Sequence, residues 1–188
     1  MFRLREHDLP EIAHICRRLD GIPLAIELAA NRLKALTVSQ IAQRLDDRFR
    51  MLTGGSELSP LRQQTMSALL DWSYELLDSD ERTMVGIASV FQGTWTLEAL
   101  VRIAADRYDQ WDTVDLLSSL ADKSLVVLEE TASGSLRYKL LESVREFGCS
   151  KLTDAERDKI TQAHAQWYFR FTEEAFDRLA GSEAPTVL

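Results

Sequence analysis

The residue types that most often carry catalysis occur singly in this sequence. Its three histidines, His7, His14 and His164, lie on separate predicted helices or near the start of the chain. Its two cysteines, Cys16 and Cys149, are far apart in sequence and form no C-x-x-C pair. Catalytic triads, thiol–imidazole pairs and metal sites need such side chains close together. The sequence therefore predicts no catalytic or metal site, and two buried or half-buried thiols in a reducing compartment.

The sequence also lacks the motifs that usually bind and hydrolyse nucleotide phosphates. The sequence contains no G-x-x-x-x-G-K-[ST] loop, and no predicted strand ends in acidic residues that could hold magnesium. Predicted strands and helices also do not alternate in βαβ order. The chain is therefore expected not to hydrolyse ATP by itself and not to be an enzyme.

One turn has residue types that suit either a structural corner or a ligand contact. Gly21 can take the left-handed conformation that ends a helix, and Pro23 has the fixed φ and the missing N–H that suit a first helical position. Residues 16–30 therefore predict a helix, a tight turn and a second helix. Local physics favours the structural corner over the ligand contact.

Three helices are predicted to position this corner in a small helical subdomain over residues 1–52. The first begins with Asp8 as its N-cap, the second runs over residues 23–34, and the third follows a capping box at residues 37–40. Paired glycines and small polar residues then predict a linker over residues 53–59.

Residues 60–152 have the element order of a winged helix. Helices are predicted to begin near residues 60, 79, 97 and 112, and the second of them is capped at Asp78 and ends at Gly93. The β-branched residues 124–129 and the alternating residues 136–141 then predict a β-hairpin, and a further helix follows.

A last helix with an aromatic face is predicted over residues 153–180, and residues 181–188 are expected to form a loose tail. Trp167, Tyr168 and Phe171 recur at helical spacing, so this helix needs a partner surface. The expected fold class is mainly α: a helical subdomain, a winged-helix unit with one β-hairpin, and a repeat-like C-terminal helix.

Charge is distributed unevenly along the 188 residues, whose formal net charge is −8. The first 50 residues hold nine Lys and Arg against seven Asp and Glu, and the remainder holds thirteen against twenty-three. Nucleic-acid and anionic-membrane binders normally show clustered excess cations, so neither role is expected. The start has no signal-peptide core and no apolar run could span a bilayer, so a cytoplasmic protein is expected.

The corner sequence Gly21-Ile22-Pro23-Leu24-Ala25 resembles the G-x-P-L-A motif of the NB-ARC class of STAND ATPases, the signal-transduction ATPases with numerous domains. Later blocks are similar to the winged-helix part of bacterial NB-ARC-type transcription regulators; they are residues 71–77, 89–91, 122–126 and 138–147. The resemblance covers most of residues 8–180 and matches only the regulatory half of such an ATPase. It implies that residues 153–180 are the first helix of a TPR-like repeat region.

The resemblance also implies roles for particular residues. In the family the motif's proline lies against the bound nucleotide, which makes Pro23, with Gly21 in the same turn, a nucleotide-contact position. The family's phosphate-contacting histidine, from a Met-His-Asp motif, is matched by Leu141, whose isobutyl group cannot donate a hydrogen bond. Four cations could face the phosphate, the missing core or only solvent: Arg17, Arg18, Arg32 and Lys34.

The expected function is the nucleotide-state-sensing, conformational-switch portion of a STAND/NB-ARC signalling ATPase or transcription regulator. The chain alone is expected to bind no cofactor, because ADP or ATP belongs to the full-length architecture. Its expected partners are the nucleotide-binding core and the downstream helical repeats.

Two alternatives stay open. A self-contained winged-helix DNA binder needs a basic face, but the helix before the hairpin is expected to present Asp115, Ser118, Ser119 and Asp122 to solvent. The only cations nearby are Lys123, Arg137 and Lys139, so DNA reading by this segment is not expected. The other alternative is a protein–protein interaction module that self-associates through exposed apolar helices.

Overall fold

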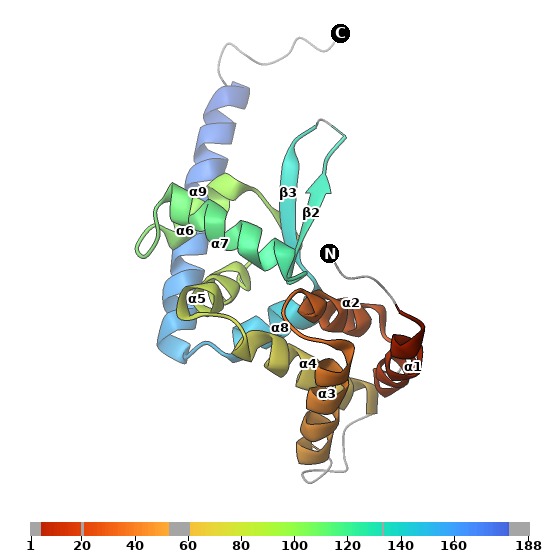
Figure 1. Cartoon of the computed structure of the whole chain (residues 1–188). Helices are drawn as coiled ribbons and strands as arrows, with labels where there is room; N and C mark the ends of the chain where they lie inside the picture. The colour runs from red at the N-terminus through yellow and green to blue at the C-terminus, as the bar shows by residue number, and fades with distance from the viewer. Residues whose placement is uncertain (1–4, 20, 53–60, 133, 181–188) are drawn as a thin grey trace. The chain divides into compact units, whose positions relative to one another are not determined.

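The structure is a computed structural model of the chain, mainly helical with one small antiparallel sheet (Figure 1). It describes residues 5–19, 21–52, 61–132 and 134–180, and the side chains of all of these except 46–52, 61–65 and 177–180. The predicted linker 53–59 and tail 181–188 lie outside the described residues. The predicted fold class, mainly α with a winged-helix-like arrangement, is confirmed.

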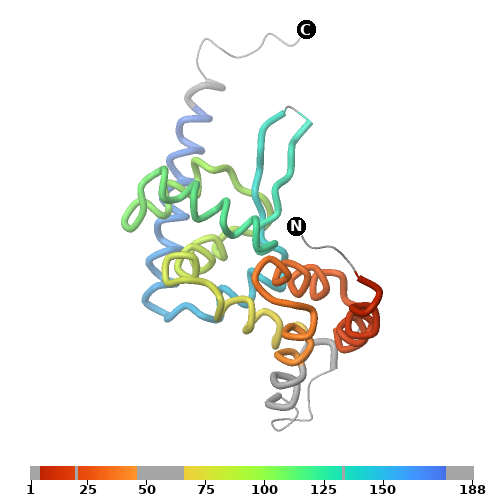
Figure 2. Tube along the Cα trace, in the orientation of Figure 1, coloured from red at the N-terminus to blue at the C-terminus, as the bar shows by residue number. Residues whose placement is uncertain are grey.

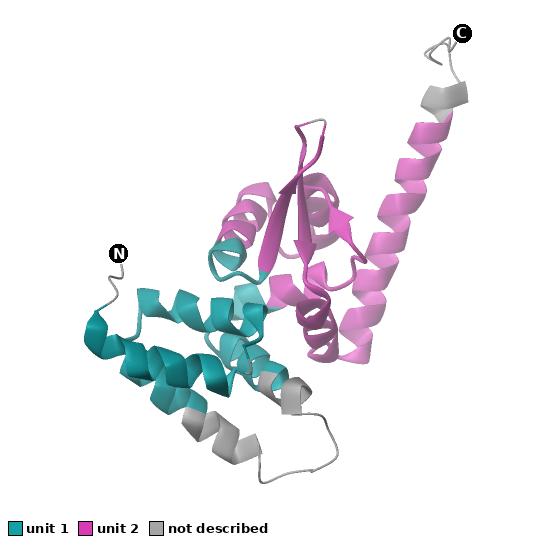
Figure 3. Cartoon of the chain, turned by 90° about the vertical axis from the view of Figure 1, so that its right-hand side faces the viewer, with its two compact units in different colours: residues 1–82, 119–125 teal, residues 83–118, 126–188 magenta. Residues whose placement is uncertain are grey.

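The chain folds into two compact units (Figure 3). Unit 1 consists of residues 1–82 and 119–125, and unit 2 consists of residues 83–118 and 126–188. Two helices contribute residues to both units; they are α5 (Ser79–Ala88) and α7 (Gln110–Asp122).

Unit 1 is all helical, and most of it is the red-to-yellow part of the trace in Figure 2. Its elements before α5 are η1 (Glu6–Asp8), α1 (Leu9–Arg18), α2 (Pro23–Asn31), η2 (Arg32–Lys34), α3 (Val38–Leu52) and α4 (Leu61–Glu75). Helix α1 contacts α3, and α4 contacts both α2 and α3. The core consists of apolar residues spaced three or four apart on each helix, among them Ile15, Leu19, Ala25, Ala29, Ile41, Leu45, Leu69 and Trp72.

Helix α4 belongs to the same compact unit as the first three helices. Leu69 and Trp72 of α4 lie in the same buried cluster as residues of α1, α2 and α3. The domains expected from the sequence are 1–52, 60–152 and 153–180, so the first expected boundary lies before α4, whereas unit 1 also contains α4.

Unit 2 has the element order of a winged helix. After the end of α5 come β1 (Thr94–Trp95), α6 (Leu97–Ala104), α7, β2 (Val126–Glu130), β3 (Leu136–Leu140), α8 (Glu142–Ser150) and α9 (Asp154–Ala180). The three strands are antiparallel in the order β1–β3–β2, with Trp95 opposite Tyr138 and Val127 opposite Lys139. The predicted hairpin is therefore confirmed. Strand β1 was not predicted, because a two-residue strand is too short to show a period of two.

An aromatic stack joins β1 to α9 inside unit 2. Helix α5 ends at Ala88, earlier than the predicted end at Gly93. Phe91 then packs its ring against Trp95, with ring centroids 5.0 Å apart. The ring of His164 on α9 meets Phe91 edge-on at 5.2 Å and lies 4.7 Å from Tyr168. Part of the aromatic face of α9 is thus half-buried within its own unit.

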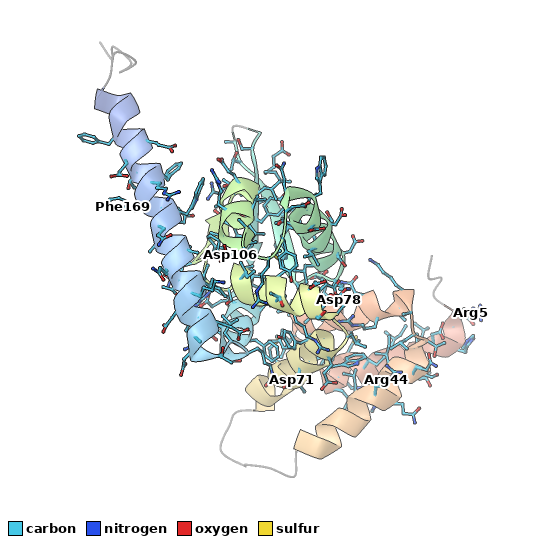
Figure 4. All side chains as sticks on the ribbon, turned by 90° about the vertical axis from the view of Figure 1, so that its left-hand side faces the viewer. Arg5, Arg44, Asp71, Asp78, Asp106 and Phe169 are labelled. Atoms are coloured by element: carbon cyan, nitrogen blue, oxygen red, sulfur yellow. The ribbon has the colours of Figure 1, made fainter. Side chains whose placement is uncertain are left out.

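Three helices begin with a capping box. The confirmed capping boxes are Thr37 with Gln40, Asp78 (labelled in Figure 4) with Glu81, and Thr153 with Glu156. Asp8 is the N-cap residue of α1, as predicted, but its side chain makes no capping hydrogen bond to that helix. Asp8 has helical φ and ψ at the end of η1, and its carboxylate accepts the N–H of Arg5 at 3.1 Å instead.

Glycine allows α8 to approach α5 closely, and this predicts the effect of a methyl group. A Cβ on Gly148 would lie 2.9 Å from Val85 Cγ1 and 3.2 Å from the Val85 carbonyl oxygen. We expect Gly148→Ala to lower the free energy of unfolding by about 1–2 kcal/mol, because overpacking outweighs the gain in helix propensity. Urea denaturation measures the change.

The control for this prediction is Gly86→Ala on α5. A Cβ there would meet only the end of the Leu152 side chain, which can rotate away. The free energy of unfolding should change little, and an equal loss at both glycines would contradict the close-packing explanation.

Candidate functional site

The turn between α1 and α2 has the geometry that its glycine and proline predict. Gly21 has a φ of +66°, and its N–H donates to the Cys16 carbonyl at 3.1 Å. The Ile22 N–H donates to the Leu19 carbonyl at 2.9 Å, and α2 begins at Pro23. Since nothing lies within 4 Å of a Cβ built on Gly21, its backbone conformation rather than lack of space requires glycine. Gly21 and Pro23 therefore lie in one hydrogen-bonded turn, which we call the corner.

The corner presents its proline and the open end of α2 to solvent. Gly21 and Pro23 are exposed, whereas Ala25, Leu28 and Ala29 on the same helix are buried. No side chain caps the start of α2, where Ile22 is extended, and first-turn N–H groups have no acceptor within their own helix. Such an end, with the partial positive charge of the helix dipole, suits an anionic group.

The four cations expected near the corner have different environments. Arg17, Arg18 and Lys34 are exposed, and Arg17 Nε donates to the Ala13 carbonyl at 3.1 Å. Arg32, by contrast, is only 9% exposed. Its guanidinium donates to the Ser73 carbonyl at 3.4 Å and lies 5.9 Å from the centroid of the Trp72 ring. Burial lowers the pKa of Arg32, and the charge of Glu81 partly opposes that shift. Arg32 is therefore a core residue, whereas the other three cations face solvent.

Glu81 is the centre of a buried polar cluster in unit 1 that the sequence analysis missed. Its side chain is ion-paired with Lys123, accepts Ser119 Oγ at 2.6 Å and accepts the N–H of Asp78 at 3.0 Å. Ser119, expected to face solvent, is thus a partner of a buried carboxylate. The capping-box position of Glu81 was visible in the sequence, but its pairing with residues about forty positions later was not.

Two hydrogen bonds join the far end of α2 to the residues just before β2. Asn31 Nδ2 donates to Ser124 Oγ at 2.6 Å, and Lys34 Nζ donates to the Asp122 carbonyl at 3.1 Å. Ser124 has a φ of +56°, an uncommon conformation for a residue other than glycine. Each end of α2 therefore adjoins a residue with a positive φ. The first end follows Gly21 in the corner, and the last residue, Asn31, is hydrogen-bonded to Ser124.

The three cations around the predicted winged helix are engaged inside the protein. Lys123 pairs with Glu81 in unit 1. In unit 2 Arg137 donates to Thr94 Oγ1 and to the Thr94 carbonyl, each at 2.8 Å, and Lys139 is ion-paired with Glu129. On α7, Asp115, Ser118 and Asp122 are exposed, as expected. This arrangement leaves these three cations unsuited to phosphate contacts.

Leu141, the position matched to the family's histidine, is the N-cap residue of α8. It is extended, half-buried and follows the buried Leu140. Glu142 is the first residue of α8, and its carboxylate accepts a hydrogen bond from Arg145 Nε at 3.0 Å. Arg145 thus pairs with Glu142 one turn earlier on the same helix. Leu141 lies in unit 2 and the corner in unit 1.

The described residues contain no group of three or more His, Cys, Asp or Glu that could hold a metal ion. Cys16 and Cys149 are free and half-buried, as predicted. His164 packs between aromatic rings, and burial lowers its pKa. Among the same residues, no helix has the length and apolar character needed to cross a membrane.

Comparison with known proteins finds similarity to parts of longer mycobacterial proteins, while no family model matches the chain. A Mycobacterium tuberculosis (strain H37Rv) protein named "Putative HTH-type transcriptional regulator" is 40% identical over 168 residues, and so is its namesake in Mycobacterium bovis. These residues make up 89% of the chain. An uncharacterized protein of M. tuberculosis is 37% identical over 152 residues, or 79% of the chain. The chain spans only 19% of the length of the named regulators and 38% of the length of the uncharacterized protein.

Proposed function

We propose that the chain is the regulatory part of a STAND/NB-ARC-type ATPase of the transcription-regulator class. In this role it senses the nucleotide state of a core outside the chain and does not itself hydrolyse ATP. The observation that carries the proposal is the corner, where a left-handed Gly21 places the exposed Pro23 at the uncapped start of α2. The names of the M. tuberculosis and M. bovis relatives support a role in transcriptional regulation.

Helix α2 connects the proposed nucleotide contact at Pro23 with the turn before β2. ADP or ATP held by the core would contact Pro23 through its apolar ring face, and its phosphates would favour the positive end of the helix. The other end of α2 and η2 bond to Ser124 and Asp122. A nucleotide that favours one position of α2 therefore also favours one arrangement of the turn before β2. Leu141 takes part only by packing, since it has no hydrogen-bond donor on its side chain.

The experiment is a chimera in which this chain replaces the 168 matching residues of the M. tuberculosis regulator. We expect the chimera to bind ADP, and Pro23→Ala to weaken ADP binding about tenfold, equivalent to roughly 1.4 kcal/mol. Calorimetric titration measures both affinities, and the chain alone should release no phosphate from ATP.

Pro10→Ala is the matched control, because Pro10 is also an exposed proline in the first turn of a helix. It should leave the affinity within about twofold, well below the tenfold change that 1.4 kcal/mol produces. If the M. tuberculosis regulator and the chimera both fail to bind ADP and ATP, the proposed function is wrong. If Pro23→Ala binds ADP normally, the corner is structural only.

A second candidate function is DNA binding, favoured by the relatives' names. The internal contacts of Lys123, Arg137 and Lys139 argue against DNA binding, because these cations already have partners within the protein. DNA binding predicts an affinity for duplex that falls steeply with salt. If the chain binds no duplex at low salt, this candidate function is wrong for the chain, and any DNA contacts of the longer relatives would be made by their other parts.

A further inference from the structure

Helix α7 carries an exposed tryptophan. Trp111 is 75% exposed, the highest value among the large apolar side chains of the described residues. Trp72 and Trp95 are buried. An indole exposed to water lacks the stabilisation that burial of its large apolar surface would give. Tryptophan is also among the residues most enriched in binding hot spots. The exposed indole marks this helix as a contact surface.

Carboxylates share the surface of α7 around Trp111. Asp115 and Ser118, four and seven residues further on, are exposed on the same side of the helix, and Asp112 is exposed beside them. Leu117, on the other side, is buried. Among the described residues, neither the Asp112 nor the Asp115 carboxylate has a hydrogen-bonded or ion-paired partner. We call Trp111, Asp112, Asp115 and Ser118 the α7 face.

The α7 face lacks a cation of its own. Residues 108–122 contain neither Lys nor Arg. The two flanking cations are engaged elsewhere, Arg107 at 4.0 Å from Glu156 and Lys123 in its ion pair with Glu81. The face therefore combines an aromatic ring with carboxylates whose charge nothing nearby on the helix neutralises.

We propose that the α7 face docks an arginine- or lysine-bearing segment of a partner protein. A guanidinium stacks well on an indole and donates to carboxylates at its edge. Residues one helical turn apart have Cβ atoms about 5–6 Å from each other, so one such group can cover Trp111 and reach Asp115. Nucleic acid does not fit, because its phosphates would meet two carboxylates. This docking requires no nucleotide and goes beyond the proposed regulatory role.

Calorimetric titration with the peptide acetyl-Gly-Arg-Gly-Arg-Gly-amide tests the proposal. We expect Trp111→Ala to weaken binding about tenfold, within the range of cation–π energies at partly desolvated sites. Asp115→Asn should weaken it roughly threefold, as expected for an exposed ion pair. Asp115 is the position of choice because Asp112, in the first turn, also favours the helix N-terminus. A peptide with Glu in place of Arg should not bind.

Two control variants distinguish binding of the peptide at the α7 face from nonspecific attraction of the peptide to an acidic protein. Phe169→Ala removes another exposed aromatic ring, on α9, and Glu98→Gln removes another exposed carboxylate, on α6. Both should leave the peptide affinity within about twofold, a change of less than half a kcal/mol. Thermal melting of each variant checks that it is folded.

Three outcomes overturn the proposal. Equal weakening by Glu98→Gln and Asp115→Asn, with no effect of Trp111→Ala, means diffuse attraction to an acidic chain. A dimer by light scattering that Trp111→Ala converts to a monomer means that a second copy covers the α7 face. Binding of a DNA duplex that Trp111→Ala abolishes means that the face contacts nucleic acid.

Discussion

Trp95→Ala is expected to lower the free energy of unfolding of unit 2 by about 4 kcal/mol, as for other large-to-small changes in a core. Trp95 is 0% exposed, and its ring stacks on Phe91, which in turn meets His164 of α9. Removing the indole leaves a cavity beside Phe91 and removes a large buried side chain from β1, the two-residue strand that pairs with β3. Urea denaturation followed by circular dichroism measures the loss.

The matched control is Trp111→Ala, which removes the same side chain from the surface. With 75% of Trp111 exposed, the change should be within about 0.5 kcal/mol, as for most surface substitutions. Similar losses at the two tryptophans would contradict the assignment of Trp95 to the core. Trp95→Phe should cost less than Trp95→Ala, because it keeps a ring against Phe91 and removes an indole N–H that has no partner among the described residues.

Glu81→Gln is expected to lower the free energy of unfolding of unit 1 by about 2 kcal/mol, less than for a fully buried pair because the Lys123 side chain is 28% exposed. The substitution keeps the shape of Glu81 but leaves the Lys123 ammonium without its counter-charge. It also weakens the acceptor for Ser119 and for the Asp78 N–H. Glu129→Gln is the matched control: Glu129 also pairs with a lysine, Lys139, but is 43% exposed. Its loss should be under about 1 kcal/mol.

The pH dependence of stability tests the charge of Glu81 separately. Burial by itself raises the pKa of Glu81, but hydrogen bonds from Lys123, Ser119 and Asp78 and the charge of Lys123 outweigh it, so the pKa lies below its ordinary value of 4.5. The unfolded state therefore takes up the proton first as the pH falls. The stabilisation is complete above pH 4.5 and is lost as the pH falls through the lower folded-state pKa. The stability difference between the chain and Glu81→Gln should shrink from pH 7 to pH 3; a constant difference would contradict this account.

Local features of the fold were predictable because their causes are local. The left-handed Gly21, the helix start at Pro23, three capping boxes and the hairpin each follow from residues within a few positions of one another. The geometry of the corner was therefore available from the sequence. A nucleotide contact at Pro23 or Leu141 stays a prediction.

The features that sequence reasoning missed depend on residues distant in the chain. Arg32 bonds to Ser73 41 positions away, Lys123 to Glu81 42 positions away, and Arg137 to Thr94 43 positions away. Helical and strand periods carry no information about such pairs. Arg32 consequently looked like a surface cation, and Lys123 and Arg137 like possible DNA contacts. Trp111 was detectable in principle, since its helix buries the opposite side at Leu117.

The placement of the tryptophans gives the chain a set of optical reporters. Trp72 lies in the core of unit 1, Trp95 in that of unit 2 and Trp111 on the surface, while Trp167 is half-buried on α9. An indole in an apolar core emits at shorter wavelength than one in water, so chains that retain a single tryptophan would each report on one environment. Fluorescence could then follow the melting of each unit separately, and the emission of Trp111 would respond to surface contacts alone.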